Sequence, residues 1–144
     1  MQNEFNPLLL DNQLCFPLYV CSKEIIRRYT PFLEPLGLTY TMYITLMSLW
    51  EHDNVSVKEL GIRLFLDSGT LTPLLKKMES QGLITRHRGE QDERNVYISL
   101  TDAGRAMEQK CRSIPQQMMC NNIISRDDAI VLVGMLHKLM SQMK

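Results

Sequence analysis

Apolar side chains recur with helical spacing in the middle of the chain. Four of them fall at positions i, i+3, i+4 and i+7, which predicts an amphipathic helix with one buried face. Asp67 or Ser68 can cap the start of this helix, and Gly82 supplies its stop. The four apolar residues are Leu71, Leu74, Leu75 and Met78.

Two short segments after this helix have the pattern of strands. Residues 83–86 read as the first strand, and the charged segment 87–93, which contains Gly89, reads as a loop. Residues 95–100 alternate strictly, with Val96, Ile98 and Leu100 on one face. A helix followed by a hairpin with a charged tip is typical of a winged helix-turn-helix.

The segments before this helix also predict helices. Residues 8–30 form the first; either it begins near residues 11–12, with Pro17 just past its first turn, or it is kinked at Pro17. Pro31 and Pro35 bound a connector that Gly37 ends. A second helix opens at Thr39 or Thr41 and runs to about residue 51. A third begins at the capping box of Ser56 and Glu59 and ends near residue 65.

The C-terminal segments complete the expected fold. Thr101 caps a long fifth helix, which Pro115 interrupts or ends, and Ser125 with Asp128 opens the last helix. The last helix carries too broad an apolar face for the wing domain to cover, so it is either an ordinary core helix or a dimer seam built with the first helix. Its apolar residues are Ile130, Val131, Leu132, Val133, Leu136, Leu139 and Met140.

The predicted fold class is therefore mainly α with a small β-hairpin. We expect one compact domain, in which residues 39–101 form a winged helix-turn-helix lobe. Residues 1–38 and 102–144 then supply the N- and C-terminal dimerisation helices of a homodimer.

Composition narrows the function classes. The 144 residues are 44% hydrophobic, no apolar run reaches the ~18 residues of a membrane span, and the N-terminus lacks signal-peptide features, so a cytoplasmic protein is expected. Lys and Arg together number 16, as do Asp and Glu, so DNA binding would need a local basic surface instead of bulk charge. No metal site or cofactor is expected, because no cysteine pair has C-x-x-C spacing.

The outward face of the helix at 68–80 is the first candidate site. Its hydroxyls can donate to phosphates or base edges, and its lysines can reach phosphates. The alternative is a solvated polar face without a ligand. The candidate residues are Ser68, Thr70, Thr72, Lys76 and Lys77. Arg86 of the facing strand is a further candidate, as a contact to the DNA backbone.

Cys15 is the second candidate site. It lies near a predicted helix start, where backbone N–H groups favour the thiolate that attacks a peroxide bond. The alternative is a buried thiol that packs as a small hydrophobe. Apolar and aromatic side chains suggest a pocket that suits organic hydroperoxides. They are the nearby Leu14, Phe16, Leu18 and Tyr19, together with Met42 and Tyr43 from further along the chain.

The central motif also carries a family resemblance. FLDSGTLTPLLK at 65–76, GLI at 82–84 and DER at 92–94 resemble the MarR family of bacterial repressors, and within it the organic hydroperoxide resistance regulators. The likeness runs from about Leu8 to Lys144. It implies a dimeric repressor that binds double-stranded operator DNA and releases it when an organic hydroperoxide oxidises a cysteine.

The resemblance also implies roles for individual residues. Arg94 matches the wing arginine that enters the minor groove, and Asp92 would orient it. Tyr29 and Tyr40 match the pair whose hydroxyls hydrogen-bond the reactive sulfur. Cys120 matches the second cysteine of the two-cysteine branch, which resolves the sulfenic acid of the partner subunit.

Other assignments stay open at this point. Cys111 lies in the same region as Cys120 and competes for the resolving role. Cys21 lies roughly 240° further round the helix than Cys15 at ~100° per residue, so it cannot share the face of Cys15. A thiol peroxidase would use the same Cys15 chemistry but would leave the wing unexplained. A MarR-type repressor that binds a small phenolic ligand would make the thiols bystanders.

Overall fold

The structure is a computed structural model that describes residues 6–120 and 123–143, with only the backbone described at Cys120. The chain divides into two compact units, residues 1–111 and residues 112–144. The first unit holds a 3₁₀ turn (Leu10–Asn12), α1 (Cys15–Leu33), a second 3₁₀ turn (Glu34–Leu36), α2 (Tyr40–Glu51), β1 (Val55–Ser56), α3 (Val57–Leu64), α4 (Ser68–Ser80), β2 (Ile84–Arg88), β3 (Val96–Leu100) and α5 (Asp102–Cys111). The second holds α6 (Ile114–Cys120) and α7 (Arg126–Ser141).

The helix-turn-helix core confirms the predicted apolar stripe. Leu71, Leu75 and Met78 of α4 are fully buried, and Leu74 is half-buried at the edge of the same face. They pack in a core that α2 and α3 share, since the buried side chains of those helices include Leu46, Leu49 and Leu60. This packing leaves the opposite face of α4 in solvent.

Side-chain caps set the predicted helix starts. Thr39 accepts a hydrogen bond from the Met42 amide at the start of α2, and Ser56 and Glu59 form the expected capping box of α3. Asp67 caps α4 by accepting from the Thr70 amide at 2.8 Å. After α4, Gly82 adopts the left-handed conformation that the turn into β2 requires, with φ of 72°.

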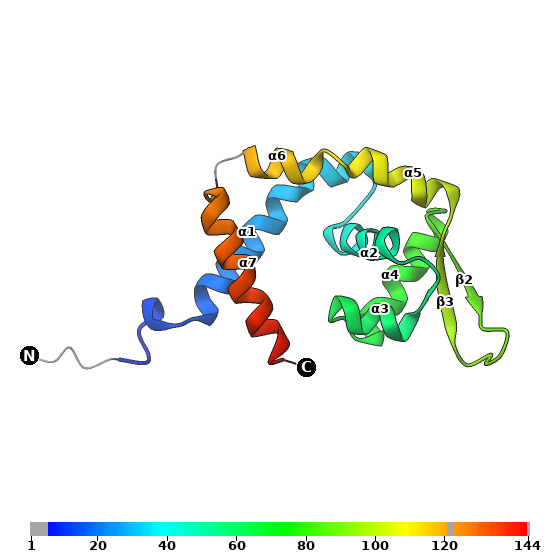
Figure 1. The fold of residues 1–144 in the computed structure, drawn as a ribbon, viewed down its shortest axis with the longest axis horizontal. Coiled ribbons are helices and arrows are strands. Elements are labelled where there is room, and N and C mark those ends of the chain that lie inside the picture. The colour runs from blue at the N-terminus through cyan, green and yellow to red at the C-terminus, as the bar shows by residue number, and fades with distance from the viewer. Residues whose placement is uncertain (1–5, 121–122, 144) are drawn as a thin grey trace, which may run out of the picture. The chain divides into compact units, whose positions relative to one another are not determined.

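The wing is larger than the predicted hairpin. A third strand, β1, pairs antiparallel with β3 to give the order β1-β3-β2, with Val55 opposite Ile98. β2 also continues to Arg88, two residues past its predicted end. Two residues are too few to show an alternating pattern, so the sequence carried no signal for β1. Figure 1 shows the β2–β3 hairpin extending away from the helices of its unit.

The first helix differs from its prediction at both ends. α1 begins at Cys15, after the separate 3₁₀ turn, and Pro17 occupies its first turn, where a missing N–H costs no helical hydrogen bond. Pro31 does not bound a connector; it lies inside the last turn of α1, which continues to Leu33. Its missing N–H removes one helical hydrogen bond, to the Arg27 carbonyl, and the helix closes beyond it with the Glu34 amide bonded to the Thr30 carbonyl. Gly37, at φ of 71°, ends the connector as expected.

The fifth helix is shorter than expected. α5 is capped by Thr101, whose hydroxyl accepts from the Gly104 amide at 3.0 Å, and it ends at Cys111. Pro115 neither interrupts nor ends it, because it lies in the first turn of the new helix α6.

The last helix is capped as predicted and exposes its apolar side chains. Ser125 accepts from the Asp128 amide at 3.1 Å. No described residue of α7 is buried, and Ile130, Val131 and Met135 are each more than 60% exposed. The described helices include none long and apolar enough to cross a membrane.

Candidate nucleic-acid interface and thiol site

The outward face of α4 presents polar side chains at its N-terminal half and basic ones further along. All five candidates on this helix are exposed: Ser68, Thr70, Thr72, Lys76 and Lys77. The Thr70 hydroxyl is already shared with the cap, since it lies 3.3 Å from Asp67 Oδ2. Hydrogen bonding from the Thr70 backbone amide also lowers the pKa of Asp67, so this cap stays ionised and holds the helix start. Ser68 and Thr72 remain as exposed hydroxyls beside the two lysines.

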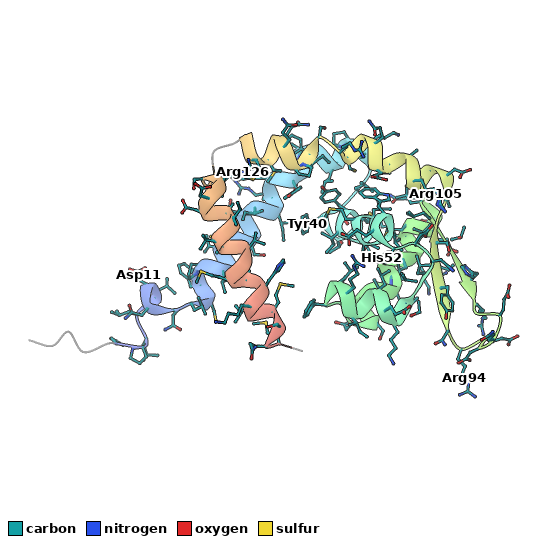
Figure 2. The ribbon with its side chains drawn as sticks, in the orientation of Figure 1. Asp11, Tyr40, His52, Arg94, Arg105 and Arg126 are labelled. Atoms are coloured by element: carbon teal, nitrogen blue, oxygen red, sulfur yellow. The ribbon has the colours of Figure 1, made fainter. Side chains whose placement is uncertain are left out.

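Arg94 lies at the tip of the wing, and its side chain points away from the helices of its unit (Figure 2). Asp92 accepts hydrogen bonds from the Arg94 backbone amide at 3.0 Å and from Asn95 Nδ2 at 3.4 Å. Asp92 therefore shapes the turn that carries Arg94, and it acts on the backbone instead of on the guanidinium.

Arg86 is engaged within the chain. Its Nε and Nη2 atoms each lie 2.8 Å from Oε2 of Glu79, in the last turn of α4. Strand β2 of the wing is thereby joined to α4 by a forked ion pair.

Cys15 is the first residue of α1 and is exposed. The apolar residues beside it are exposed too: Leu14 at 67%, Phe16 at 37% and Tyr19 at 62%. Met42 and Tyr43, by contrast, are buried in the packing of α2. The sixth predicted pocket residue, Leu18, is half-buried on α1. Within one chain these six residues do not line a common surface. A cavity of about 590 Å³ lies instead beside the wing, and its lining is mainly polar: Asn54, residues 87–92, Asn95 and Tyr97.

Tyr29 and Tyr40 lie together, with ring centroids 5.1 Å apart. Tyr43 completes the group at 5.8 Å from Tyr29 and 6.3 Å from Tyr40. Burial raises the pKa of all three phenols, that of Tyr43 to about 12, so they remain hydrogen-bond donors at neutral pH. The sequence predicts Tyr43 as a pocket residue and not as a member of this cluster, although its i+3 spacing from Tyr40 is a usable signal.

The tyrosine cluster and Cys15 are far apart in one chain. Cys15 and Tyr29 lie at opposite ends of the continuous helix α1. Fourteen residues of helical rise put about 21 Å between their backbones. No hydrogen bond between them can form within a single chain.

The other thiols differ in environment. Cys21 is exposed on α1, and Cys111 is buried at the end of α5, close enough to Tyr43 to influence its ionisation. Burial raises the pKa of the Cys111 thiol and so disfavours its thiolate. The side chain of Cys120, for which the resolving role is predicted, lies outside the described residues. Among the described residues no cluster of three or more His, Cys, Asp or Glu side chains could hold a metal ion.

Comparison with known proteins places this architecture. Residues 27–111 match the family described as Transcriptional regulator SarA/Rot. The chain is 47% identical over 140 residues to the organic hydroperoxide resistance transcriptional regulator of Bacillus subtilis, covering 97% of this chain and 95% of that protein. Reduced AbfR bound to DNA, a Staphylococcus epidermidis protein, has a similar structure, with a TM-score of 0.72, 32% identity and coverage of 92% and 93%. The C80S mutant of MarR from E. coli, complexed with operator DNA, gives a TM-score of 0.80 at 26% identity, with coverage of 88% and 92%.

The chain belongs to the MarR/SarA family of transcriptional regulators.

Membership of the MarR/SarA family decides between two of the sequence-based alternatives. It is a family of transcriptional regulators and not of enzymes, so the thiol peroxidase alternative is set aside. The mainly helical winged-helix fold with a small antiparallel sheet matches MarR structures, as predicted. The roles of individual residues within this MarR/SarA chain stay predictions.

Proposed function

We propose that this protein is a DNA-binding repressor that senses organic hydroperoxides through Cys15. One observation supports this proposal above the others: an exposed cysteine stands at the first residue of α1, in the same unit as a winged helix-turn-helix. A relative that is 47% identical is named for organic hydroperoxide resistance. AbfR, another relative, has been solved in a reduced form bound to DNA.

The DNA contacts divide between the helix and the wing. The exposed face of α4 enters the major groove, where Ser68 and Thr72 contact base edges or phosphates and the lysines contact phosphates. Arg94, exposed at the wing tip, enters the minor groove alongside. The protein has no net charge, so this local set of donors must supply the attraction.

The functional form is a homodimer. The apolar side chains of α7 and those at the start of α1 are exposed, and an apolar area of that extent on a folded chain calls for a partner. A second copy satisfies it, because helix-turn-helix proteins pair on two half-sites about 34–36 Å apart. The dimerisation helices are then those of residues 1–38 and 102–144.

The dimer also resolves the separation of Cys15 from the tyrosines. Since about 21 Å of helix separates Cys15 from Tyr29 in one chain, the phenols that bind the Cys15 sulfur must come from the partner copy. Tyr29 and Tyr40 remain protonated because burial raises their pKa, so they can donate to a thiolate. Leu14, Phe16 and Tyr19 of one subunit would then close an apolar pocket over that site.

The chemistry proceeds in two steps. The Cys15 thiolate attacks the O–O bond of a hydroperoxide ROOH, which forms Cys15–SOH and releases ROH after protonation of the alkoxide. The thiol of Cys120 in the partner subunit then attacks the sulfenic sulfur, which forms a disulfide and releases water. The disulfide draws together two segments that were apart, and the winged-helix units lose their register with the grooves.

A gel-shift series tests this proposal. The probe is a duplex that the reduced protein selects from a random-sequence pool. Cumene hydroperoxide should release the wild-type protein, and a thiol reductant should restore binding. Cys15→Ser should bind the same duplex and stay bound after peroxide. Release of that variant at the wild-type rate would remove Cys15 from the sensor role, and release by a phenolic ligand alone would favour the ligand-binding alternative.

A further inference from the structure

The Glu79–Arg86 ion pair joins the recognition helix to the wing. Arg86 directs two N–H groups, each at 2.8 Å, to one carboxylate oxygen of Glu79. Arg86 lies opposite Ile98 in the sheet, so it shares the face of the hairpin on which Ile98 is fully buried. Both charged side chains are about one-third exposed, which makes this pair less screened by solvent than a fully exposed one.

Glu79 stands at an electrostatically unfavourable position unless it is paired. It lies in the last turn of α4, next to the negative end of the helix dipole, where a carboxylate weakens a helix. It also places a negative charge on an element that has to approach phosphates. Both effects are offset by the guanidinium of Arg86, and this indicates that Glu79 serves the pair.

A second contact continues the connection to the wing tip. Arg88, two residues along the same face of β2, donates from Nη1 to the backbone carbonyl of Glu93 at 3.4 Å. Glu93 directly precedes Arg94, whose amide is held by Asp92 at 3.0 Å. The end of α4 is thus linked through β2 to the residue at the wing tip.

We propose that Glu79 and Arg86 are positioning residues for DNA binding. They hold the wing at a fixed distance from the recognition helix, so that Arg94 reaches the minor groove while α4 lies in the major groove. Arg86 acts through Glu79 and not through a phosphate. This inference rests on the proposed DNA binding. It adds that one ion pair fixes the major-groove contact of α4 relative to the minor-groove contact of Arg94.

The two possible roles of this pair predict opposite results for one substitution. If charge alone mattered, Glu79→Gln would remove a negative charge and free Arg86 for phosphate, so affinity would rise. If the pair positions the wing, Glu79→Gln should lower the affinity for DNA. The expected loss is about fivefold, the size typical of coupling between two residues of one ion-pair network. Glu90→Gln in the exposed wing loop is the matched control, because it removes the same charge without removing an ion pair that we describe.

The experiment measures affinity for the selected duplex at several salt concentrations, with circular dichroism to check that each variant is folded. Arg86→Gln should weaken binding without changing the slope of log K against log salt, whereas loss of a phosphate contact would reduce that slope by about 0.9. The double variant Glu79→Arg with Arg86→Glu restores an ion pair of reversed polarity. It should bind DNA more tightly than Glu79→Arg alone or Arg86→Glu alone. Unchanged or tighter binding by Glu79→Gln, or a reduced slope for Arg86→Gln, would overturn the positioning role. If the wild-type protein selects no duplex at all, the proposed DNA binding fails instead.

Discussion

The carbonyl oxygen of Leu83 lies directly against the Cα atom of Gly104, where α5 meets the start of the wing. A Cβ atom at residue 104 would overlap the Leu83 carbonyl and would also press on the Leu100 side chain. Two hydrogen bonds hold the approach: the Thr101 amide donates to the Leu83 carbonyl at 3.1 Å, and Trp50 Nε1 donates to the Gly104 carbonyl at 3.0 Å. Residue 104 must therefore be glycine for steric reasons.

Gly104→Ala is accordingly expected to destabilise the winged-helix unit strongly. The added methyl group would meet the backbone carbonyl of Leu83, which cannot rotate away as a side chain could. The free energy of unfolding should therefore fall by roughly 3 kcal/mol or more. Urea unfolding followed by circular dichroism measures it. Ala103→Gly, at the preceding exposed position, is the matched control and should cost only about 0.5–1 kcal/mol. Equal costs for the two variants would contradict the steric argument.

Arg94→Ala should weaken binding to the selected duplex while leaving the fold intact. Arg94 is exposed at the wing tip, and its loss should cost ~1–3 kcal/mol if it makes a specific contact. Fluorescence anisotropy with a labelled duplex gives the affinity. Arg126→Ala removes the same charge from α7, outside the winged-helix unit, and should have little effect. Unchanged affinity of Arg94→Ala would discard the wing contact.

The resolving thiol can be identified on a non-reducing gel. After treatment with cumene hydroperoxide, wild-type protein should give a subunit-linked band, and Cys120→Ser should not. Cys111→Ala should keep the band, because Cys111 is buried and burial raises its pKa, so little thiolate is available to attack. Loss of the band in Cys111→Ala, with retention in Cys120→Ser, would exchange the two assignments.

Local signals in the sequence predicted most of the fold. The stripe of Leu71, Leu75 and Met78 and the cap pairs Ser56–Glu59 and Ser125–Asp128 act within one helix, so neighbouring residues determine them. The predicted ends of α1 are wrong because neighbouring residues alone do not determine them. Whether the chain stays helical past Pro31 depends on the packing of later residues such as Leu33, which is buried, and the proline itself does not reveal that packing.

The candidate site was predicted less completely, because its contacts join residues that are distant in sequence or in different copies. The sequence predicts Arg86 as a contact to the DNA backbone and gives no sign of Glu79, which the fold brings to it. Tyr43 joins Tyr29 only because α1 and α2 pack together. The reverse holds for Cys15 and the predicted pocket, since motif matching grouped residues that a single chain keeps apart.

Tyr43 should make the free energy of unfolding depend on pH in the alkaline range. Burial, with further contributions from Tyr29, Cys111 and Tyr40, raises its pKa from 10.0 to about 12. The folded state therefore holds this proton more tightly than the unfolded state, so the stabilisation is complete below pH 10 and is lost as pH rises through about 12. Absorbance titration at alkaline pH should show a late phenol that Tyr43→Phe removes. Tyr19→Phe, which removes an exposed phenol, should leave that late phase in place.

The origin of the phenols that bind the Cys15 sulfur can be tested with mixed dimers. One subunit carries Cys15→Ser, and the other carries Tyr29→Phe with Tyr40→Phe. If the tyrosines come from the partner, as the length of α1 requires, this heterodimer holds one complete site, because the intact Cys15 meets the intact tyrosines of the other copy. If they came from the same chain, it would hold none.

The readout is the rate at which dimedone traps sulfenic acid after a pulse of cumene hydroperoxide, measured on heterodimers purified through two different tags. Per Cys15 thiol, the heterodimer should react at the wild-type rate, whereas the tyrosine double variant alone should react more slowly because its thiolate lacks donors. A heterodimer as slow as the tyrosine variant would show that the phenols do not act across subunits, and since one helix holds Cys15 and Tyr29 apart, they could then have no direct part in activating the thiol.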